Sequence, residues 1–280
     1  MRQIHINEII ENVRNLSIEI NTTLSEDITD ALKKAQEIEE SSIGKEVLGH
    51  LLENIRIARN ESLPICQDTG LAVIFVEMGQ DVHIIGGNLR DAINEGVRQG
   101  YREGYLRKSV LNDPLLRKNT GDNTPAIIHI DVVPGDSLKI RMAAKGGGSE
   151  NSSAMKMMKP SDGVKGIKEF VLDTVNKAWA NPCPPIIVGL GIGGNFETAP
   201  ILAKKALFRH LGEHNPAPHL ANLERELLAE VNGLGVGSEG FGGTVTALAV
   251  HIEAAPCHIA SLPVAVNIDC HVSRHREILI

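Results

Sequence analysis

Aromatic residues and cysteines are scarce in this sequence, and each scarcity excludes a class of protein. Its 280 residues include five Phe, two Tyr, one Trp and four Cys. So few aromatic rings leave little surface for stacking nucleic-acid bases, and the formal net charge of −7 argues against a polyanionic partner. We therefore expect no nucleic-acid partner. A chain of this length buries enough aliphatic surface to fold without disulfides.

Long apolar runs and export signals are also missing. The first segment, MRQIHINEIIENVRNL, mixes charged and apolar side chains and lacks the apolar stretch of a signal peptide. The longest apolar run, Leu71–Val76, is far shorter than the roughly 18 residues that a membrane helix needs. We therefore expect no membrane partner and a cytoplasmic location. In that reducing compartment, cysteines are core residues, metal ligands or catalysts rather than disulfides.

The spacing of apolar residues predicts an α/β fold in which mixed sheets are surrounded by helices. We expect a single domain over residues 1–280, with a helical N-terminal segment over about residues 1–62, because no linker or repeat interrupts the chain. Strands are predicted at 71–76, 184–190, 244–252 and 259–268, a hairpin at 128–132 and 138–142, and helices at 89–101, 164–175, 196–210 and 219–232.

The segment Gly189–Gly194 contains the spacing G-x-G-x-x-G between a predicted strand and a predicted helix, as in dinucleotide-binding proteins. Those proteins carry an acidic residue about 20 residues later, at the end of a second strand. Here that region, Phe208–Leu211, belongs to a predicted helix. An NAD enzyme is one alternative, and a tight turn between strand and helix is the plainer interpretation.

The segment Cys270–His275 offers cysteine and histidine ligands for zinc. A structural zinc site needs four ligands, usually in two closely spaced pairs, and the sequence contains no C-x-x-C. Cys257 and Cys270 are separated by a predicted strand, which disfavours a compact zinc finger. A catalytic cysteine paired with a distant histidine stays open as well.

Three cysteines occupy special turns, whereas Cys257 does not. Cys66 begins the turn CQDTG before a strand, Cys183 is flanked by prolines in NPCPP, and Cys270 follows the last long strand. A further turn, KGGGSEN, exposes backbone amides that suit an anion. Each turn also has a purely structural explanation. Three thiolates, however, hold three irons of a cubane cluster and leave the fourth iron open.

In this order the motifs resemble those of the iron-sulfur class I fumarate hydratases. The similarity is closest to the alpha subunit of the two-subunit form, which is equivalent to the N-terminal part of the single-chain enzymes, and it covers most of the chain. It implies a hydro-lyase that reversibly hydrates fumarate to (S)-malate. The matching segments are CQDTG (66–70), AKGGGSEN (144–151), NPCPP (181–185), GIGG (191–194) and HIASLPVAVN (258–267).

The resemblance also implies a set of site residues. A 4Fe-4S cluster would be held by Cys66, Cys183 and Cys270, with Cys257 a bystander, and its open iron would act as a Lewis acid on the substrate. The residues expected to contact substrate are Gln67, Asp68, Arg107, Gly146, Gly147 and Gly148. His258 is expected near the leaving hydroxyl, and we hypothesise that Asp68 and His258 supply its proton.

The remaining substrate contacts and the base for the carbon-bound proton are expected on a separate beta subunit, because the matching C-terminal part is absent. The assembly would be a heterodimer or a heterotetramer. One alternative is the related L-tartrate dehydratase alpha subunit, which converts tartrate to oxaloacetate. Another is a non-catalytic iron-sulfur or zinc protein, in which Cys257 would have to join the ligands.

Overall fold

The computed structural model describes residues 2–280, which fold as two compact units. Unit 1 contains the described residues up to Ser25 together with Ile55–Gly147 and Arg274–Ile280. Unit 2 contains Glu26–Asn54 and Gly148–Ser273. Each unit combines segments that are distant in sequence, and a single domain over residues 1–280 stays a prediction.

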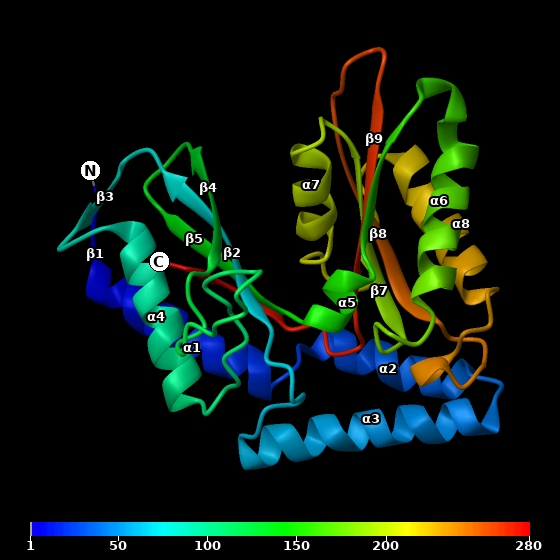
Figure 1. The fold of residues 1–280 in the computed structure, drawn as a ribbon, viewed down its shortest axis with the longest axis horizontal. Coiled ribbons are helices and arrows are strands. Elements are labelled where there is room, and N and C mark those ends of the chain that lie inside the picture. Colours follow the sequence, from blue (N-terminus) through cyan, green and yellow to red (C-terminus); the bar gives the residue numbers. More distant parts are fainter. Residues whose placement is uncertain (1) are drawn as a thin grey trace. The chain divides into compact units, whose positions relative to one another are not determined.

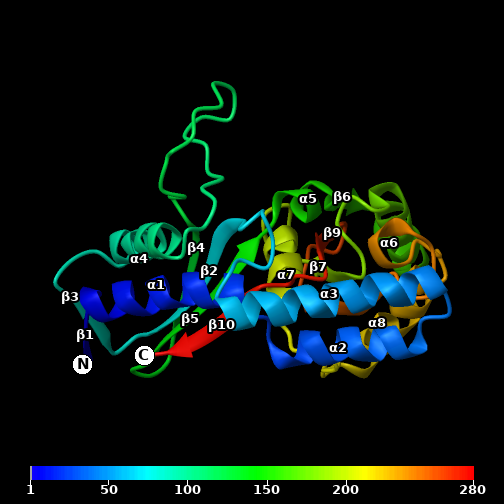
Figure 2. The same ribbon diagram turned by 90° about the horizontal axis from the view of Figure 1, so that it is seen from below.

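Unit 1 is built on a four-stranded sheet in the order β10-β5-β2-β4, and two helices, α1 and α4, share its apolar core (Figure 1). A small parallel pair, β1 and β3, lies beside it. Between α4 and β4, a long segment projects from the unit as an arm (Figure 2). The elements are β1 (Arg2–His5), α1 (Ile6–Thr22), β2 (Leu71–Gly79), β3 (Val82–Ile85), α4 (Leu89–Glu103), β4 (Ile127–Val133), β5 (Leu138–Lys145) and β10 (His275–Leu279).

The predicted hairpin of strands 128–132 and 138–142 is wrong. Both strands form, but β2 lies between them, parallel to β4 and antiparallel to β5. The reason is burial: β2 is apolar on both faces and almost wholly buried, whereas β4 is exposed or half-buried along its length. A strand that is apolar on both faces is stabilised at the centre of a sheet, and β4 is left at the edge.

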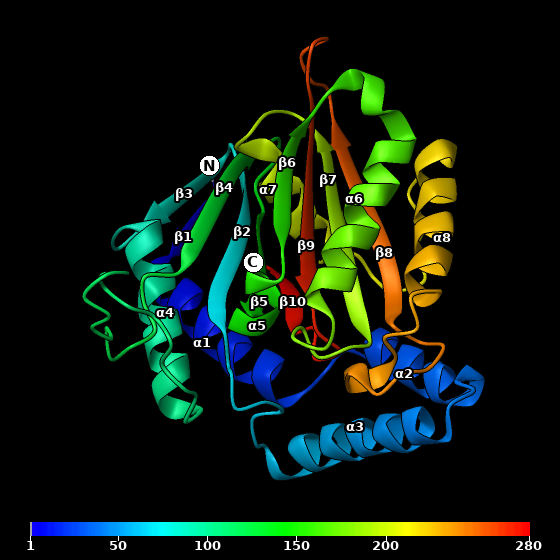
Figure 3. The same ribbon diagram turned by 45° about the vertical axis from the view of Figure 1, so that its right-hand side comes forward.

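Unit 2 is built on a sheet in the order β6-β9-β7-β8 (Figure 3). Helix α7 covers one face of this sheet, and α6 and α8 cover the other (Figure 1). Its elements, with α3 and α5 crossing the unit boundary, are α2 (Glu26–Ile38), α3 (Ser42–Glu61), α5 (Gly147–Asn151), β6 (Ala154–Met158), α6 (Gly163–Ala178), β7 (Ile186–Gly193), α7 (Thr198–Ala206), α8 (Pro218–Asn232), β8 (Ala247–Ala255) and β9 (Leu262–Asp269), with 3-10 turns at Pro160–Asp162 and Ser238–Gly240.

The glycine spacing at 189–194 has a packing explanation. Gly189 and Gly191 lie inside β7, on the face covered by α7. A Cβ at these positions would lie 2.2 Å from the carbonyl oxygen of Ala203 and 1.9 Å from that of Ala199. Side chains here would push α7 off the sheet, so the glycines are required for close helix-strand contact.

The predicted fold class is confirmed. The chain is mixed α/β, and the predicted helical N-terminal segment corresponds to α1, α2 and α3, preceded by the short strand β1. Among residues 2–280, every helix is too short or too polar to cross a bilayer.

Candidate active site

Two of the predicted cluster ligands lie at the same edge of the unit 2 sheet. Cys183 comes three residues before β7, and Cys270 directly follows β9. These strands are antiparallel neighbours, with Ile187 opposite Asp269. The start of one and the end of the other therefore meet at one edge. The Cys183 side chain is exposed and that of Cys270 is half-buried, so both are accessible to a ligand.

His271 fixes the turn that carries Cys183. The carbonyl oxygen of Cys183 accepts hydrogen bonds from the His271 backbone N–H at 3.3 Å and from its ring Nδ1 at 3.0 Å. Cys183 has a φ of 53°, an unusual value for a residue with a side chain. Since His271 is bonded covalently to Cys270, these contacts tie the two cysteine backbones together.

Glu239 supports the same turn and was not found by sequence reasoning. Its carboxylate lies 3.2 Å from the His271 ring, and its backbone N–H donates to the Pro184 carbonyl at 2.8 Å. Nothing in the sequence marks Glu239, because it lies in a glycine-rich loop without apolar periodicity. Glu239 thus contacts both the residue after Cys183 and the residue after Cys270, and it fixes the two segments relative to each other.

The loop that carries Glu239 is anchored by a buried carboxylate, that of Glu39 at the end of α2. Glu39 is 1% exposed and accepts backbone hydrogen bonds from Ser41, Thr244 and Val245. Burial alone would raise the pKa of this carboxyl, but the backbone donors outweigh burial and lower it. Glu39 therefore stays ionised at neutral pH and holds the loop after Glu239 against the end of α2.

The glycine turn is tied to the Cys270 segment on its unit 2 side. Ser149 donates to Asp269 at 3.4 Å, and the same Asp269 oxygen accepts the Cys270 backbone N–H at 3.2 Å. The Glu150 carboxylate in α5 accepts hydrogen bonds from the Lys204 ammonium group of α7 at 2.7 Å and from the Asn267 side-chain amide of β9 at 3.0 Å. Ser149 and Glu150 thus anchor the C-terminal end of the glycine turn to β9 and α7.

In unit 1, the turn Cys66–Gly70 meets the other side of the glycine turn. The Asp68 carboxylate accepts the backbone N–H groups of Gly70 at 3.0 Å and of Gly147 at 2.7 Å. The Thr69 hydroxyl donates to the Arg107 carbonyl at 2.8 Å. The fold therefore brings together Cys66, Asp68, Gly147 and the backbone of Arg107. Gln67 and Arg107 are both exposed.

Two buried polar side chains, those of Tyr101 and Arg274, donate hydrogen bonds to backbone carbonyls of the Cys66–Gly70 turn. The Tyr101 hydroxyl donates to the Thr69 carbonyl at 2.6 Å, and burial raises the pKa of Tyr101, so it stays a neutral donor. Arg274, only 2% exposed, donates from Nη1 to the Asp68 carbonyl at 2.5 Å and to Asn21 at 3.2 Å. A buried cation thus lies beneath a turn that carries a thiol and a carboxylate.

Replacing Arg274 by leucine is expected to lower the free energy of unfolding by about 2–4 kcal/mol, because buried acceptors lose a charged donor. Urea unfolding of the metal-free protein measures this. Arg276→Leu is the matched control: Arg276 pairs with Glu19 in a partly exposed ion pair of 3.1 Å, whose loss costs at most about 1 kcal/mol. Equal losses in the two variants would contradict the proposed support of the turn by Arg274.

His258 and Cys257 lie at the opposite edge of the unit 2 sheet from Cys183 and Cys270. They occupy the loop between β8 and β9. Since β7 spans eight residues, at about 3.3 Å per residue the two edges are roughly 25 Å apart. The exposed His258 ring accepts the Ala260 N–H at Nδ1, 3.1 Å away. In the neutral ring, Nε2 therefore carries the proton.

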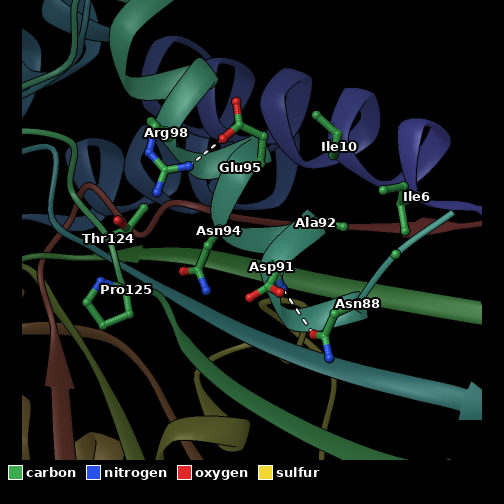
Figure 4. A pocket seen from close by; sticks show the side chains of 11 residues that line it. Ile6, Ile10, Asn88, Asp91, Ala92, Asn94, Glu95, Arg98, Thr124 and Pro125 are labelled. Atoms are coloured by element: carbon green, nitrogen blue, oxygen red, sulfur yellow. Dashed lines mark hydrogen bonds and ion pairs between the residues drawn. The ribbon is translucent and has the colours of Figure 1, made fainter.

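Two cavities, each within one unit, lie apart from the predicted site residues. One of about 630 Å³ in unit 1 is lined by α1, the first half of α4 and Thr124-Pro125 (Figure 4). Its polar groups are already engaged, since Asn88 caps Asp91 and Glu95 pairs with Arg98. Another, of about 650 Å³ in unit 2, lies between α2, α8 and the start of β8. Neither is lined by a predicted site residue.

Within residues 2–280, no group of three or more His, Cys, Asp or Glu side chains is arranged to hold a metal ion. Cys183 and Cys270 belong to unit 2, and Cys66 belongs to unit 1.

Comparison with known proteins gives consistent similarities. A family model described as "Fumarate hydratase (Fumerase)" matches residues 10–279. The "Putative L(+)-tartrate dehydratase subunit alpha" of Methanocaldococcus jannaschii is 46% identical over 257 residues, which cover 90% of each chain. The "L(+)-tartrate dehydratase subunit alpha" of Escherichia coli O157:H7 is 33% identical over 283 residues, which cover all of this chain and 93% of the relative.

Proposed function

This chain belongs to the fumarate hydratase (Fumerase) family, and we propose that it is the alpha subunit of an iron-sulfur hydro-lyase that interconverts fumarate and (S)-malate. The observation that carries the proposal is the placement of Cys183 and Cys270 at one edge of a sheet, with their backbones joined through His271. The ordered motifs and the length of the match support it further, and the family establishes a hydro-lyase subunit.

The residues fit a 4Fe-4S cluster. Thiolates are the ligands such clusters use, and the accessible thiols of Cys183 and Cys270 lie in a turn fixed by backbone hydrogen bonds. We propose Cys66 as the third ligand, as the resemblance implies. When bound, the cluster supplies an iron with an open position that acts as a Lewis acid toward the substrate hydroxyl and carboxylate.

The chain's own residues bind substrate and move a proton. We propose that the exposed Arg107 guanidinium receives a substrate carboxylate through its planar fork, beside Gln67, Asp68 and the turn Gly146–Gly148. Conversion of (S)-malate to fumarate releases one hydroxide and one carbon-bound proton, which together make water. Asp68 and His258 are proposed to protonate the departing hydroxide. The base for the carbon-bound proton is proposed to lie on the beta subunit.

His258 is proposed to serve the site of a second copy of this chain. Within its own unit it lies roughly 25 Å from the edge that carries Cys183 and Cys270, too far for a proton transfer. Its exposed ring, protonated at Nε2, is suited to a partner site. This geometry favours a heterotetramer of two alpha and two beta subunits over a heterodimer, since a closed two-fold arrangement gives each site one His258.

The beta partner is supported by the names of the relatives, which are called "subunit alpha". Those names also favour a second candidate reaction, dehydration of L(+)-tartrate to oxaloacetate. Tartrate differs from malate by one added hydroxyl, and a site that binds that hydroxyl discriminates strongly, whereas one that does not discriminates only moderately. The substrate therefore depends on few contacts.

The proposed substrate is tested by kcat/KM of the alpha-beta complex, purified anaerobically, toward (S)-malate, fumarate and L(+)-tartrate. We expect (S)-malate and fumarate to exceed tartrate by about 10-fold or more. The reverse order would assign tartrate as the substrate while leaving the hydro-lyase chemistry in place.

A further inference from the structure

The arm between α4 and β4, residues 105–122, is folded on itself rather than loose. Leu111 and Asn119 form an antiparallel bridge, and the Asn112 N–H donates to the Lys118 carbonyl at 2.9 Å. The arm nevertheless projects away from the rest of unit 1 (Figure 2). A protruding segment with internal order has a defined shape to offer to a partner.

The tip of the arm presents two adjacent leucines to solvent. Leu115 is 88% exposed and Leu116 is 82% exposed. The Asp113 carboxylate accepts their backbone N–H groups at 2.8 and 2.6 Å and so fixes the turn that displays them. A single exposed leucine is ordinary, but two neighbours held outward at the end of an arm are typical of a contact surface.

The base of the arm is joined firmly to unit 1. Arg98 of α4 donates to Asp122 at 2.9 Å. Burial acts to raise the pKa of Asp122, but hydrogen bonds from Thr124 and Arg98 outweigh it and lower this pKa to about 2, so the pair persists at neutral pH. Asn123 donates to the Gly70 carbonyl at 3.1 Å. A partner held at the tip would therefore be positioned relative to the Cys66–Gly70 turn.

The charge of the arm is opposite to that of the chain. The arm carries four basic residues, Arg107, Lys108, Arg117 and Lys118, and two acidic ones, Asp113 and Asp122, whose carboxylates are engaged within unit 1. The whole chain has a net charge of −7. A basic arm on an acidic chain is complementary to another copy of the same chain.

We propose that the arm, residues 105–122, binds a second copy of this chain and buries Leu115 and Leu116 against it. In a two-fold dimer, each copy contributes one arm, so the contact is made twice. The proposal extends the proposed function, because His258 there also needs a second copy. The arm proposal is tested by the molar mass of the assembly, whereas the proposed function is tested by turnover. Either proposal can therefore fail without the other.

The double variant Leu115→Asp/Leu116→Asp tests the arm, with the molar mass measured by size-exclusion chromatography and light scattering. The wild type is expected to contain two copies of this chain, alone and with the beta subunit, and the variant one. Its circular-dichroism spectrum is expected to match that of the wild type, since both side chains are exposed within the single chain. Leu279→Asp, at a leucine 69% exposed in the same unit, is the control and should keep the wild-type mass.

A charge variant checks the same contact without altering the leucines. Arg117→Glu/Lys118→Glu is expected to weaken self-association at least 10-fold, and added salt should weaken the wild-type dimer. The proposal is overturned if the leucine variant retains two copies. If the variant keeps two copies and also loses the beta subunit, the beta subunit rather than a second copy of this chain occupies the arm.

Discussion

Serine at position 183 or 270 is expected to abolish iron binding and to reduce turnover by at least about 1,000-fold, because the Lewis acid is lost. Both thiols lie at one sheet edge and are joined through His271. Cys66→Ser is expected to have the same effect. The measurements are iron and sulfide per chain and the rate of fumarate hydration, in protein purified anaerobically with the beta subunit.

Cys257 supplies the control for these variants. It lies at the opposite sheet edge, where its thiol contacts the Ser261 carbonyl at 3.4 Å. Cys257→Ser should retain iron and turnover. If it loses iron while Cys183→Ser does not, the chain is a non-catalytic iron-sulfur or zinc protein and the hydro-lyase assignment of these ligands is wrong.

Alanine at position 258 is expected to reduce turnover about 100- to 1,000-fold while leaving the iron content unchanged, as for loss of a general acid. The ring donates from Nε2 because Nδ1 accepts the Ala260 N–H. An unchanged rate would remove His258 from the mechanism. A parallel loss of iron would show that it supports the fold instead.

Mixing variants distinguishes action on a second copy from action within one chain. When His258→Ala and Cys183→Ser chains are unfolded, mixed in equal amounts and reassembled with the beta subunit, half of the dimers contain one of each. If His258 acts on the second copy, each mixed dimer has one intact site, and roughly a quarter of wild-type activity returns. If it acts within its own chain, no mixed dimer has an intact site and no activity returns.

Local patterns in the sequence predicted most of the elements, because each depends on apolar spacing within a short window. They failed where the outcome depends on distant segments. The sequence Pro134-Gly135 is typical of a turn between two strands. The flanking strands β4 and β5 are nevertheless separated by β2, because β2 is apolar on both faces and is buried at the centre of the sheet. The glycines of β7 matched a ligand-binding pattern, but they serve contact with α7.

The site shows the same division. The motifs predicted Cys66, Cys183 and Cys270 as cluster ligands, which stays a prediction, and the structure brings the latter two to one sheet edge. Sequence reasoning did not find Glu239 or Arg274, since both act through contacts with residues far away along the chain. It also gave no sign that His258 lies at the other end of the sheet, because distance across a sheet is set by strand order and direction.

The central claim is that this chain carries a cluster but only part of an active site. It is tested most directly by titrating the candidate beta subunit into the chain reconstituted with iron and sulfide, while following fumarate hydration. We expect the chain alone to show the broad visible absorption of a cluster and almost no turnover, with full activity at one equivalent of beta subunit. Full turnover without a partner, or a colourless protein with stoichiometric zinc, would contradict this claim.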